Sequence, residues 1–249
     1  MVTPPDSTRR GPIPLRTLSR RIVACERCPR LRAHCREVAR VKRRAFRDEP
    51  YWGKPVPGFG DPEAHLWVVG LAPAAHGGNR TGRVFTGDPS GSWLYEALHA
   101  FGFANQALAV SKDDGLELRG AYVSAAARCA PPDNKPTPEE LENCRPFLVE
   151  EWRRFRRARV VIGLGAIAWE GLLRVLRDDG VALPKPRPKF AHGAEVSLGP
   201  GLPVLLGCYH PSRRNTQTGL MTRVMFHAVF ARAREWVGGP GGLSRHRPS

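Results

Sequence analysis

The sequence predicts an α/β fold, a three-layer α/β/α sandwich around a central four-stranded parallel sheet. Four short apolar runs lack polar alternation, which is typical of parallel strands covered on both faces. Segments with helical periodicity lie between these runs, as in consecutive βαβ units. The chain has 249 residues, 41% of them hydrophobic, so one domain of this kind with a packed core is expected.

Each expected strand leads into a loop rich in Gly, Pro, His, Asn or Cys. The strands are residues 66–71 (LWVVGL), 121–126 (AYVSAA), 159–164 (RVVIGL) and 203–208 (PVLLGC). In open parallel sheets, ligands bind outside the carboxyl ends of the strands. The four loops therefore predict a functional site at one edge of the sheet.

Start signals predict the helices. Residues 15–47, ahead of the first strand, indicate one or two Arg-rich helices. Later helices are expected to begin at Ser90 or Ser92, at the capping box TPEE of residues 137–140, after Gly165 and near Thr218.

The chain is expected to form one domain between two loose ends, because no internal repeat and no Pro/Gly-rich linker divides its middle. We expect a basic flexible tail over residues 1–19, the domain over residues 20–237 and a flexible tail over residues 238–249.

Charge points to an anionic partner. The formal net charge is +16, and residues 1–50 hold 14 basic against five acidic side chains. Such a field favours nucleic acid or an anionic membrane surface. The sequence has no run of 18 apolar residues and no apolar signal core at its N-terminus. We therefore expect no membrane span and no secretion, and we expect a cytoplasmic location.

The cysteines suggest a metal centre. Cys25 and Cys28 form a C-x2-C pair, Cys129 ends the second strand, and Cys144 lies on the expected inward face of the following helix. Four thiolates can hold zinc or a [4Fe–4S] cluster, and the long gap between the two pairs argues against a compact zinc ribbon. Buried thiols or disulfides are the alternatives. The two other cysteines are expected to be unliganded: Cys35 and Cys208.

One alternative function that the sequence suggests is binding of a dinucleotide cofactor. Gly163, Gly165 and Ala168 match G-x-G-x-x-A between a strand and a helix. The acidic residue expected about 20 positions later, at the end of the next strand, is missing. A tight strand-to-helix turn is the better interpretation, and no nucleotide cofactor is expected.

Several long motifs resemble the uracil-DNA glycosylase superfamily, specifically its iron–sulfur family 5 (type B). They are CERCPRL from residue 25, KRRAFRDEPYWGKPVPGFGDPEA from 42, GLAPAAHGGNRTGRVFTGD from 70, ARCAPPDNKPTPEELENC from 127 and YHPSRRNTQTG from 209. The resemblance covers about residues 20–237. It implies a monofunctional glycosylase that flips uracil, hypoxanthine or xanthine out of double-stranded DNA and starts base excision repair. It also implies a [4Fe–4S] cluster on Cys25, Cys28, Cys129 and Cys144, and a monomer acting in the cytoplasm at the nucleoid.

The resemblance also assigns roles to residues. The catalytic candidates are Asp88, His210 and Asn134. The candidates for binding the base are Ala72, Ala74, Phe85 and His76. The candidates for binding DNA are Arg80, Lys135, Arg213, Arg214, Asn215 and Gln217, with Arg83 as a further phosphate contact.

Several of these roles have a purely structural alternative. Asp88 can be a helix N-cap and Asn134 a turn residue, and any single Arg can be a solvated surface charge. Leu71 and Ala125 stand where related family-4 enzymes carry polar groups, so a less selective pocket is expected. A non-enzymatic iron–sulfur module that binds nucleic acid is the second rival, although it would not need the pocket residues.

Overall fold

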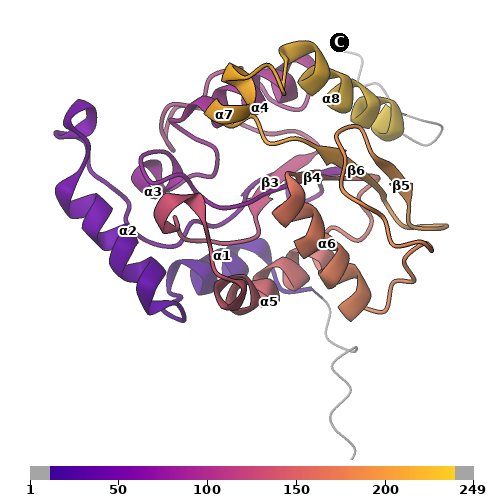
Figure 1. Cartoon of the computed structure of the whole chain (residues 1–249), viewed down its shortest axis with the longest axis horizontal. Coiled ribbons are helices and arrows are strands. Elements are labelled where there is room, and N and C mark those ends of the chain that lie inside the picture. Colours follow the sequence, from indigo (N-terminus) through magenta and orange to yellow (C-terminus); the bar gives the residue numbers. More distant parts are fainter. Residues whose placement is uncertain (1–11, 239–249) are drawn as a thin grey trace, which may run out of the picture.

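The computed structural model describes residues 12–238 (Figure 1). Of the predicted tails (residues 1–19 and 238–249), residues 1–11 and 239–249 lie outside this range.

A six-stranded sheet with the order β1-β3-β2-β4-β6-β5 forms the centre of the described chain. The strands are β1 (Phe59–Gly60), β2 (Leu66–Gly70), β3 (Ala121–Ala125), β4 (Val160–Leu164), β5 (Glu195–Ser197) and β6 (Val204–Cys208). The four inner strands pair in parallel, which confirms the predicted core. β1 and β5 add antiparallel edges of two and three residues, too short to leave a strand pattern in the sequence.

The helices cover the sheet on both faces, as Figure 1 shows for α4 and α8 on one side and α5 and α6 on the other. The helices are α1 (Leu15–Val23), α2 (Pro29–Val41), α3 (Gly78–Thr81), α4 (Pro89–Ala100), α5 (Pro138–Arg154), α6 (Ala166–Asp178), α7 (Arg213–Gln217) and α8 (Arg223–Gly238), with short 3-10 helices η2 (Arg44–Phe46) and η3 (Pro132–Asn134).

Alternate strand residues supply the two cores. In β2, Val68 packs into the core that contains residues of α4 and α8. Trp67 and Val69 pack into the core that contains residues of α5 and α6. Because successive side chains of a strand point to opposite faces, a strand buried on both faces is apolar throughout. The three-layer sandwich is confirmed.

Helix α4 is capped by Asp88, the alternative that the sequence offered beside Ser90 and Ser92. Asp88 is the N-cap: its carboxylate accepts a hydrogen bond from the Gly91 amide at 3.0 Å, and Pro89 takes the first helical position. Ser90 and Ser92 lie inside the first turn, so the caps predicted there are wrong.

The other helix starts follow the sequence signals more closely. In the capping box of α5, the Glu140 amide donates to Thr137 Oγ1 at 3.2 Å, and the Thr137 amide donates to the Glu140 carboxylate at 2.8 Å. Helix α6 follows Gly165 as expected. The last helix begins at Arg223 rather than near Thr218, because the short helix α7 precedes it.

The N-terminal boundary also needs correction. Helix α1 begins at Leu15, and its buried Leu18 and Ile22 pack with Phe147 of α5. Residues 15–19 therefore belong to the folded domain and not to a tail, and at the other end Gly238 closes α8. No helix within the described range is long and apolar enough to cross a membrane.

Candidate active site

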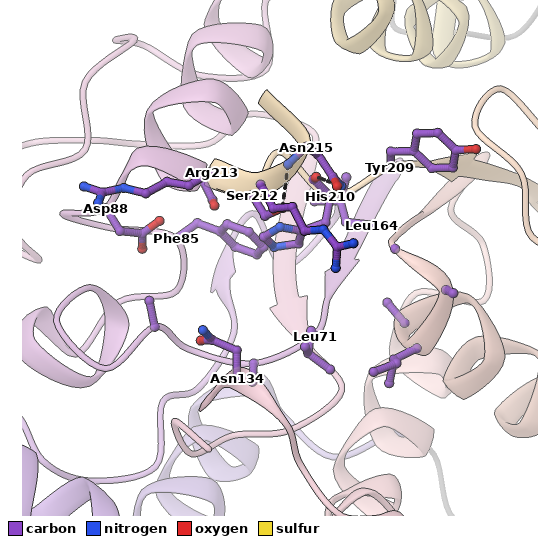
Figure 2. A pocket seen from close by; sticks show the side chains of 18 of the residues that line it. Leu71, Phe85, Asp88, Asn134, Leu164, Tyr209, His210, Ser212, Arg213 and Asn215 are labelled. Atoms are coloured by element: carbon purple, nitrogen blue, oxygen red, sulfur yellow. Dashed lines mark hydrogen bonds between the residues drawn. The ribbon is translucent and has the colours of Figure 1, made fainter. Parts of the chain in front are cut away.

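A cavity of about 890 Å³ lies at the carboxyl edge of the sheet, where the four loops were expected to meet (Figure 2). The four loops begin at the same height along the sheet, because β2, β3, β4 and β6 pair in parallel with their ends aligned. The residues predicted for the site that line this cavity are Ala72, Ala74, Phe85, Asp88, Asn134, His210, Arg213, Arg214 and Asn215.

Phe85 forms an aromatic wall of the cavity. Its ring packs on the backbone at the end of β2, where a Cβ on Gly70 would lie 2.4 Å from the ring Cζ. The Phe85 backbone has φ 51°, a left-handed conformation that non-glycine residues seldom adopt. The first turn of α4 fits tightly against it, since a Cβ on Gly91 would lie 1.8 Å from the Phe85 carbonyl oxygen. Strain held by such close packing is a feature of functional sites.

His210 lies beside Phe85, with their ring centroids 6.0 Å apart and their planes inclined by 32°. Burial lowers the pKa of His210 to about 4, so its imidazole is neutral at neutral pH. The His210 carbonyl accepts a hydrogen bond from Asn215 Nδ2 at 2.8 Å. Asn215, predicted to bind DNA, thus holds the histidine loop through its amide group.

Asp88 combines two of the roles weighed from the sequence. It caps α4, and its carboxylate also lines the cavity. Burial raises its pKa above the usual range, against the lowering effects of the Gly91 and Ser90 amides and of Arg80. The carboxylate abuts Gly77, where a Cβ would lie 2.2 Å from Asp88 Oδ2.

One side-chain hydrogen bond joins the first and last loops of the site. Ser90 Oγ, in the first turn of α4, donates to the Pro211 carbonyl at 3.1 Å. The loop that carries Asp88 is thereby fastened to the loop that carries His210. This contact has no signal in the sequence, because its partners are 121 positions apart.

Asn134 lies across the cavity from Phe85 (Figure 2). It ends η3 with φ 56° and is exposed, so its carboxamide is open to a ligand. Leu71 lines the same cavity with an apolar side chain. Ala125, by contrast, is buried at the end of β3.

Three residues predicted to touch substrate or DNA do not line the cavity and have partners within the described chain. His76 does not line the cavity; its Nδ1 is hydrogen-bonded to the Tyr51 hydroxyl at 2.9 Å. Arg80 is 7% exposed, pairs with Glu49 and donates to the carbonyls of His76 and Gly87.

Arg83 is likewise 4% exposed and forms a two-pronged ion pair with Asp114, at 2.7 and 2.9 Å. Buried guanidinium groups with all of these partners cannot reach a DNA phosphate. The prediction of DNA contacts for Arg80 and Arg83 is therefore corrected.

The exposed cations and amides stand at the rim. Arg213 and Arg214 line the mouth of the cavity and are exposed. Lys135 and Gln217 are exposed on the same loops but do not line it. The DNA-binding role of these four side chains stays a prediction.

Sequence reasoning missed part of the wall. Ile167 at the start of α6, Phe190 and Tyr209 also line the cavity. Tyr209 directly precedes the predicted His210, and the half-exposed Ile167 follows the glycine-rich turn. Their position beside predicted site segments could have identified both residues. Phe190 lies in a Pro- and Lys-rich segment without a regular pattern, which gave none.

The glycine-rich turn after β4 has a structural explanation. Gly165 has φ 91°, which favours glycine, and a Cβ on Gly163 would lie 3.2 Å from Cα of Trp169. Both glycines thus serve the tight passage from strand to helix. This favours the turn over a dinucleotide site.

Of the four cysteines predicted as metal ligands, Cys25 and Cys28 precede α2, Cys129 follows β3 and Cys144 lies in α5. Cys28 is the N-cap of α2, and Arg30 just after it grips Glu140 of α5 with two hydrogen bonds of 2.7 Å. Burial raises the pKa of Cys144 to about 11, and Cys28 and Cys25 add to this rise. The pKa of Cys129 is raised by its hydrogen bond with Cys35, by burial and by Cys144.

All six cysteines are free, so the disulfide alternative is wrong. Between residues 12 and 238, no three Cys, His, Asp or Glu side chains stand close enough to hold a single metal ion. Thiolates on one zinc ion lie roughly 4 Å apart, because each Zn–S bond is about 2.3 Å.

A [4Fe–4S] cluster is a larger body that four cysteines hold from outside. Two observations fit it: Asn143 Nδ2 donates to the Cys28 sulfur at 3.7 Å, and buried Nη1 of Arg32 has no partner in the described chain. The donor set therefore suits a cluster with anionic sulfur.

Comparison with known proteins agrees with this geometry. The family model of the uracil DNA glycosylase superfamily matches residues 57–234. The chain is 50% identical over 217 residues to the type-5 uracil-DNA glycosylase of Thermus thermophilus, covering 87% of this chain and 95% of that protein. It is 48% identical over 218 residues to that of Mycobacterium tuberculosis, covering 87% and 80%. It is 47% identical over 229 residues to that of Mycobacterium leprae, covering 92% and 97%. Fold, pocket and similarity together show that the chain belongs to the uracil-DNA glycosylase superfamily, a family of DNA glycosylases, and within it to the type-5 enzymes.

Proposed function

We propose that this protein removes uracil from double-stranded DNA by hydrolysing the N-glycosidic bond, the first step of base excision repair. One observation carries the proposal: Phe85, Asp88, Asn134 and His210, from three separate loops, line one cavity at the carboxyl edge of the sheet. The type-5 uracil-DNA glycosylases to which the chain is similar support the choice of uracil.

The base enters the cavity by leaving the DNA stack, because a glycosylase cannot reach the bond inside a duplex. Phe85 offers a flat apolar face on which the flipped base stacks. Asn134 can donate to and accept from the Watson–Crick edge, since a carboxamide has both groups. Exposed Arg213 and Arg214 at the rim hold the phosphates, which positions the strand without reading its sequence.

His210 acts on the departing base. Since its pKa is lowered to about 4, the neutral ring donates a hydrogen bond to the anion that forms as the bond breaks. Donors positioned where charge develops are typically worth about 10²–10³ in rate.

Asp88 acts on the sugar side. Its carboxylate stabilises the cationic sugar of the transition state and orients the attacking water. This role requires the ionised form, and burial raises the pKa of Asp88. The excision rate should therefore fall at acid pH as this carboxylate becomes protonated.

A wider choice of bases follows from the apolar positions. Leu71 lines the cavity and Ala125 is buried, so neither supplies a polar group that would select uracil alone. Hypoxanthine and xanthine are the further substrates we propose. The described cavity lining contains no lysine, which favours simple hydrolysis to an abasic site over Schiff-base chemistry.

The cofactor we propose is a [4Fe–4S] cluster on Cys25, Cys28, Cys129 and Cys144. When bound, it would supply a cross-link between the N-terminal helices and α5. The active cavity is built from one chain, and we propose a monomer that acts on DNA in the cytoplasm without a nucleotide cofactor.

The test uses a labelled duplex with a single uracil, incubated with the protein and then treated with alkali. Strand cleavage after alkali, and none before it, is the expected result. Matched duplexes with hypoxanthine or xanthine test the wider range. A duplex that stays intact for all three bases would overturn the proposal, and a covalent complex trapped by borohydride would overturn the monofunctional mechanism.

A further inference from the structure

The cavity is larger than a single base needs. Its volume of about 890 Å³ is near the upper end of the range of about 300–1,000 Å³ for pockets that enclose whole drug-sized ligands. A uracil ring stacked on Phe85 would fill only one part of it. Another part is lined by three side chains that have no role in the proposed reaction: Ile167, Phe190 and Tyr209. These three residues define the aromatic lobe of the cavity.

The aromatic lobe lies away from the reacting groups. Figure 2 shows the Tyr209 side chain on the opposite side of His210 from Phe85. Ile167 is 41% exposed in the first turn of α6, and the adjacent Gly165 and Ala166 have too little side chain to fill the space. A base held between Phe85 and His210 therefore leaves the lobe open to a second flat group.

Ring contacts fix the walls of the lobe. The ring centroids of Phe190 and Tyr209 are 5.8 Å apart, and Phe190 also contacts Trp169 of α6 at 6.0 Å. On its other side, Tyr209 contacts the His192 ring at 5.3 Å, and His192 Nδ1 accepts a hydrogen bond from the Tyr209 amide at 3.3 Å. The aromatic faces are therefore held in place before any ligand binds.

Backbone hydrogen bonds tie the segment that carries Phe190 to strand β6. The Gly193 amide donates to the Gly207 carbonyl at 2.8 Å, and the Gly207 amide donates to the Ala194 carbonyl at 2.8 Å. Phe190 is thus fixed next to Tyr209 although its own segment has no regular secondary structure. A preformed binding surface costs little ordering entropy when a ligand binds.

The surroundings of the lobe indicate what occupies it. Aromatic faces are stacking platforms for the bases of nucleic acid strands, and they tolerate any sequence because every base has a π face. The lobe is continuous with the cavity proposed to take uracil, and exposed Arg213 and Arg214 line the same cavity, where they attract phosphate. The nucleotide next to uracil is tethered to it through one such phosphate.

We propose that the aromatic lobe binds the base next to uracil in the same DNA strand, which stacks on Tyr209 beside Phe190 and Ile167. The inference rests on the proposed glycosylase function and adds a second base subsite to it. The neighbouring base does not react, so this subsite strengthens binding of the substrate strand and leaves the bond-breaking step unchanged.

The test is a cycle of protein variants and DNA substrates, read by single-turnover uracil excision at increasing protein concentration. The substrates are a duplex with one uracil and two duplexes in which a tetrahydrofuran spacer, a nucleotide without a base, replaces the 5′ or the 3′ neighbour. Wild type is compared with Tyr209→Leu and Tyr209→Phe. Trp236→Leu is the matched control, because Trp236 is an aromatic residue of α8, 38% exposed, that does not line the cavity.

We expect Tyr209→Leu to raise the half-saturating protein concentration for the normal duplex by about tenfold, the usual worth of one stacked base, with the maximal rate unchanged. With the spacer on one of the two sides, wild type and Tyr209→Leu should differ by no more than about twofold, because the stacking partner is already absent. Easier flipping of uracil beside a spacer is common to all variants and cancels in the cycle. Tyr209→Phe, which keeps the ring, and Trp236→Leu should match wild type on every substrate.

Tyr209 also packs on the core, so thermal unfolding of each variant is measured first. If Tyr209→Leu does not fold, Ile167→Ala takes its place, since Ile167 is largely free of the core, and its loss should again vanish with one of the spacers.

An equal loss on all three substrates, or no loss on any, would overturn the inference alone, provided that wild type excises uracil. A loss with hypoxanthine but not with uracil would also overturn it, because the lobe would then hold part of the excised purine. If wild type excises no uracil, the proposed function fails, and the inference fails with it.

Discussion

Gly77 has no room for a side chain, because the carboxylate of Asp88 occupies the space beside its Cα. A Cβ at position 77 would lie 2.2 Å from Oδ2, 2.9 Å from Cγ and 3.0 Å from Cβ of Asp88. The substitution Gly77→Ala therefore displaces the Asp88 carboxylate while leaving its chemical group in place.

The size of the effect follows from these distances. To restore a normal contact, the carboxylate must move by about 1 Å, and a displacement of that size in an active site can cost about 10² in rate. The effect on stability should be small, because the Asp88 side chain can rotate away from the new methyl group. It then loses only its capping hydrogen bond to the Gly91 amide, which lowers the free energy of unfolding by about 1 kcal/mol. Gly77→Ala should thus separate catalysis from folding.

The assay is single-turnover excision from a duplex with one uracil, paired with thermal unfolding of each variant. Gly171→Ala is the control: its Cβ, within α6, would meet only Leu148 and Ala126, at 3.8 and 3.9 Å. It should keep the wild-type rate and gain about 0.5–1 kcal/mol in stability, because glycine is unfavourable inside a helix. A rate for Gly77→Ala within threefold of wild type would refute the role of Asp88.

Three further predictions follow. The pKa of His210 is about 4 in the fold and about 6.5 in the unfolded chain, so the unfolded state binds more protons between these values. Stability should therefore fall by on the order of 3 kcal/mol from pH 6.5 to pH 4, a loss absent from denaturant unfolding of His210→Gln. Arg214→Ala should reduce the slope of log K for DNA binding against log salt by about 1, whereas Arg80→Ala should leave this slope unchanged and lower the melting temperature. Cys144→Ser should lose bound iron on chemical analysis, and Cys208→Ser should keep it; equal iron in both would contradict the ligand assignment.

The sheet and the pocket could be predicted because both leave local signals. Strands covered on both faces are apolar throughout, and parallel strands bring their carboxyl ends to one edge. Phe85, Asp88, Asn134 and His210 all follow such strands and line the same cavity. The edge strands β1 and β5 escaped because two or three residues carry no periodicity.

Burial of the arginines could not be predicted in this way. Arg80 and Arg83 stand in a polar, Gly-rich segment typical of a surface loop. Their partners Glu49 and Asp114 each lie 31 positions away in the chain. A local pattern cannot reveal a partner at that distance, so the sequence assigned both residues to DNA, whereas in the structure they are buried and paired.

The packing around Phe85 has a consequence for how this family can diverge. A side chain on Gly70 would strike the Phe85 ring, and one on Gly91 would strike its carbonyl oxygen. The left-handed backbone of Phe85 persists only while both neighbours stay bare. Positions 70, 85 and 91 are therefore expected to covary: in an alignment of type-5 sequences they should change together or not at all. A single replacement at position 70 or 91 should be selected against through its effect on folding, independently of catalysis.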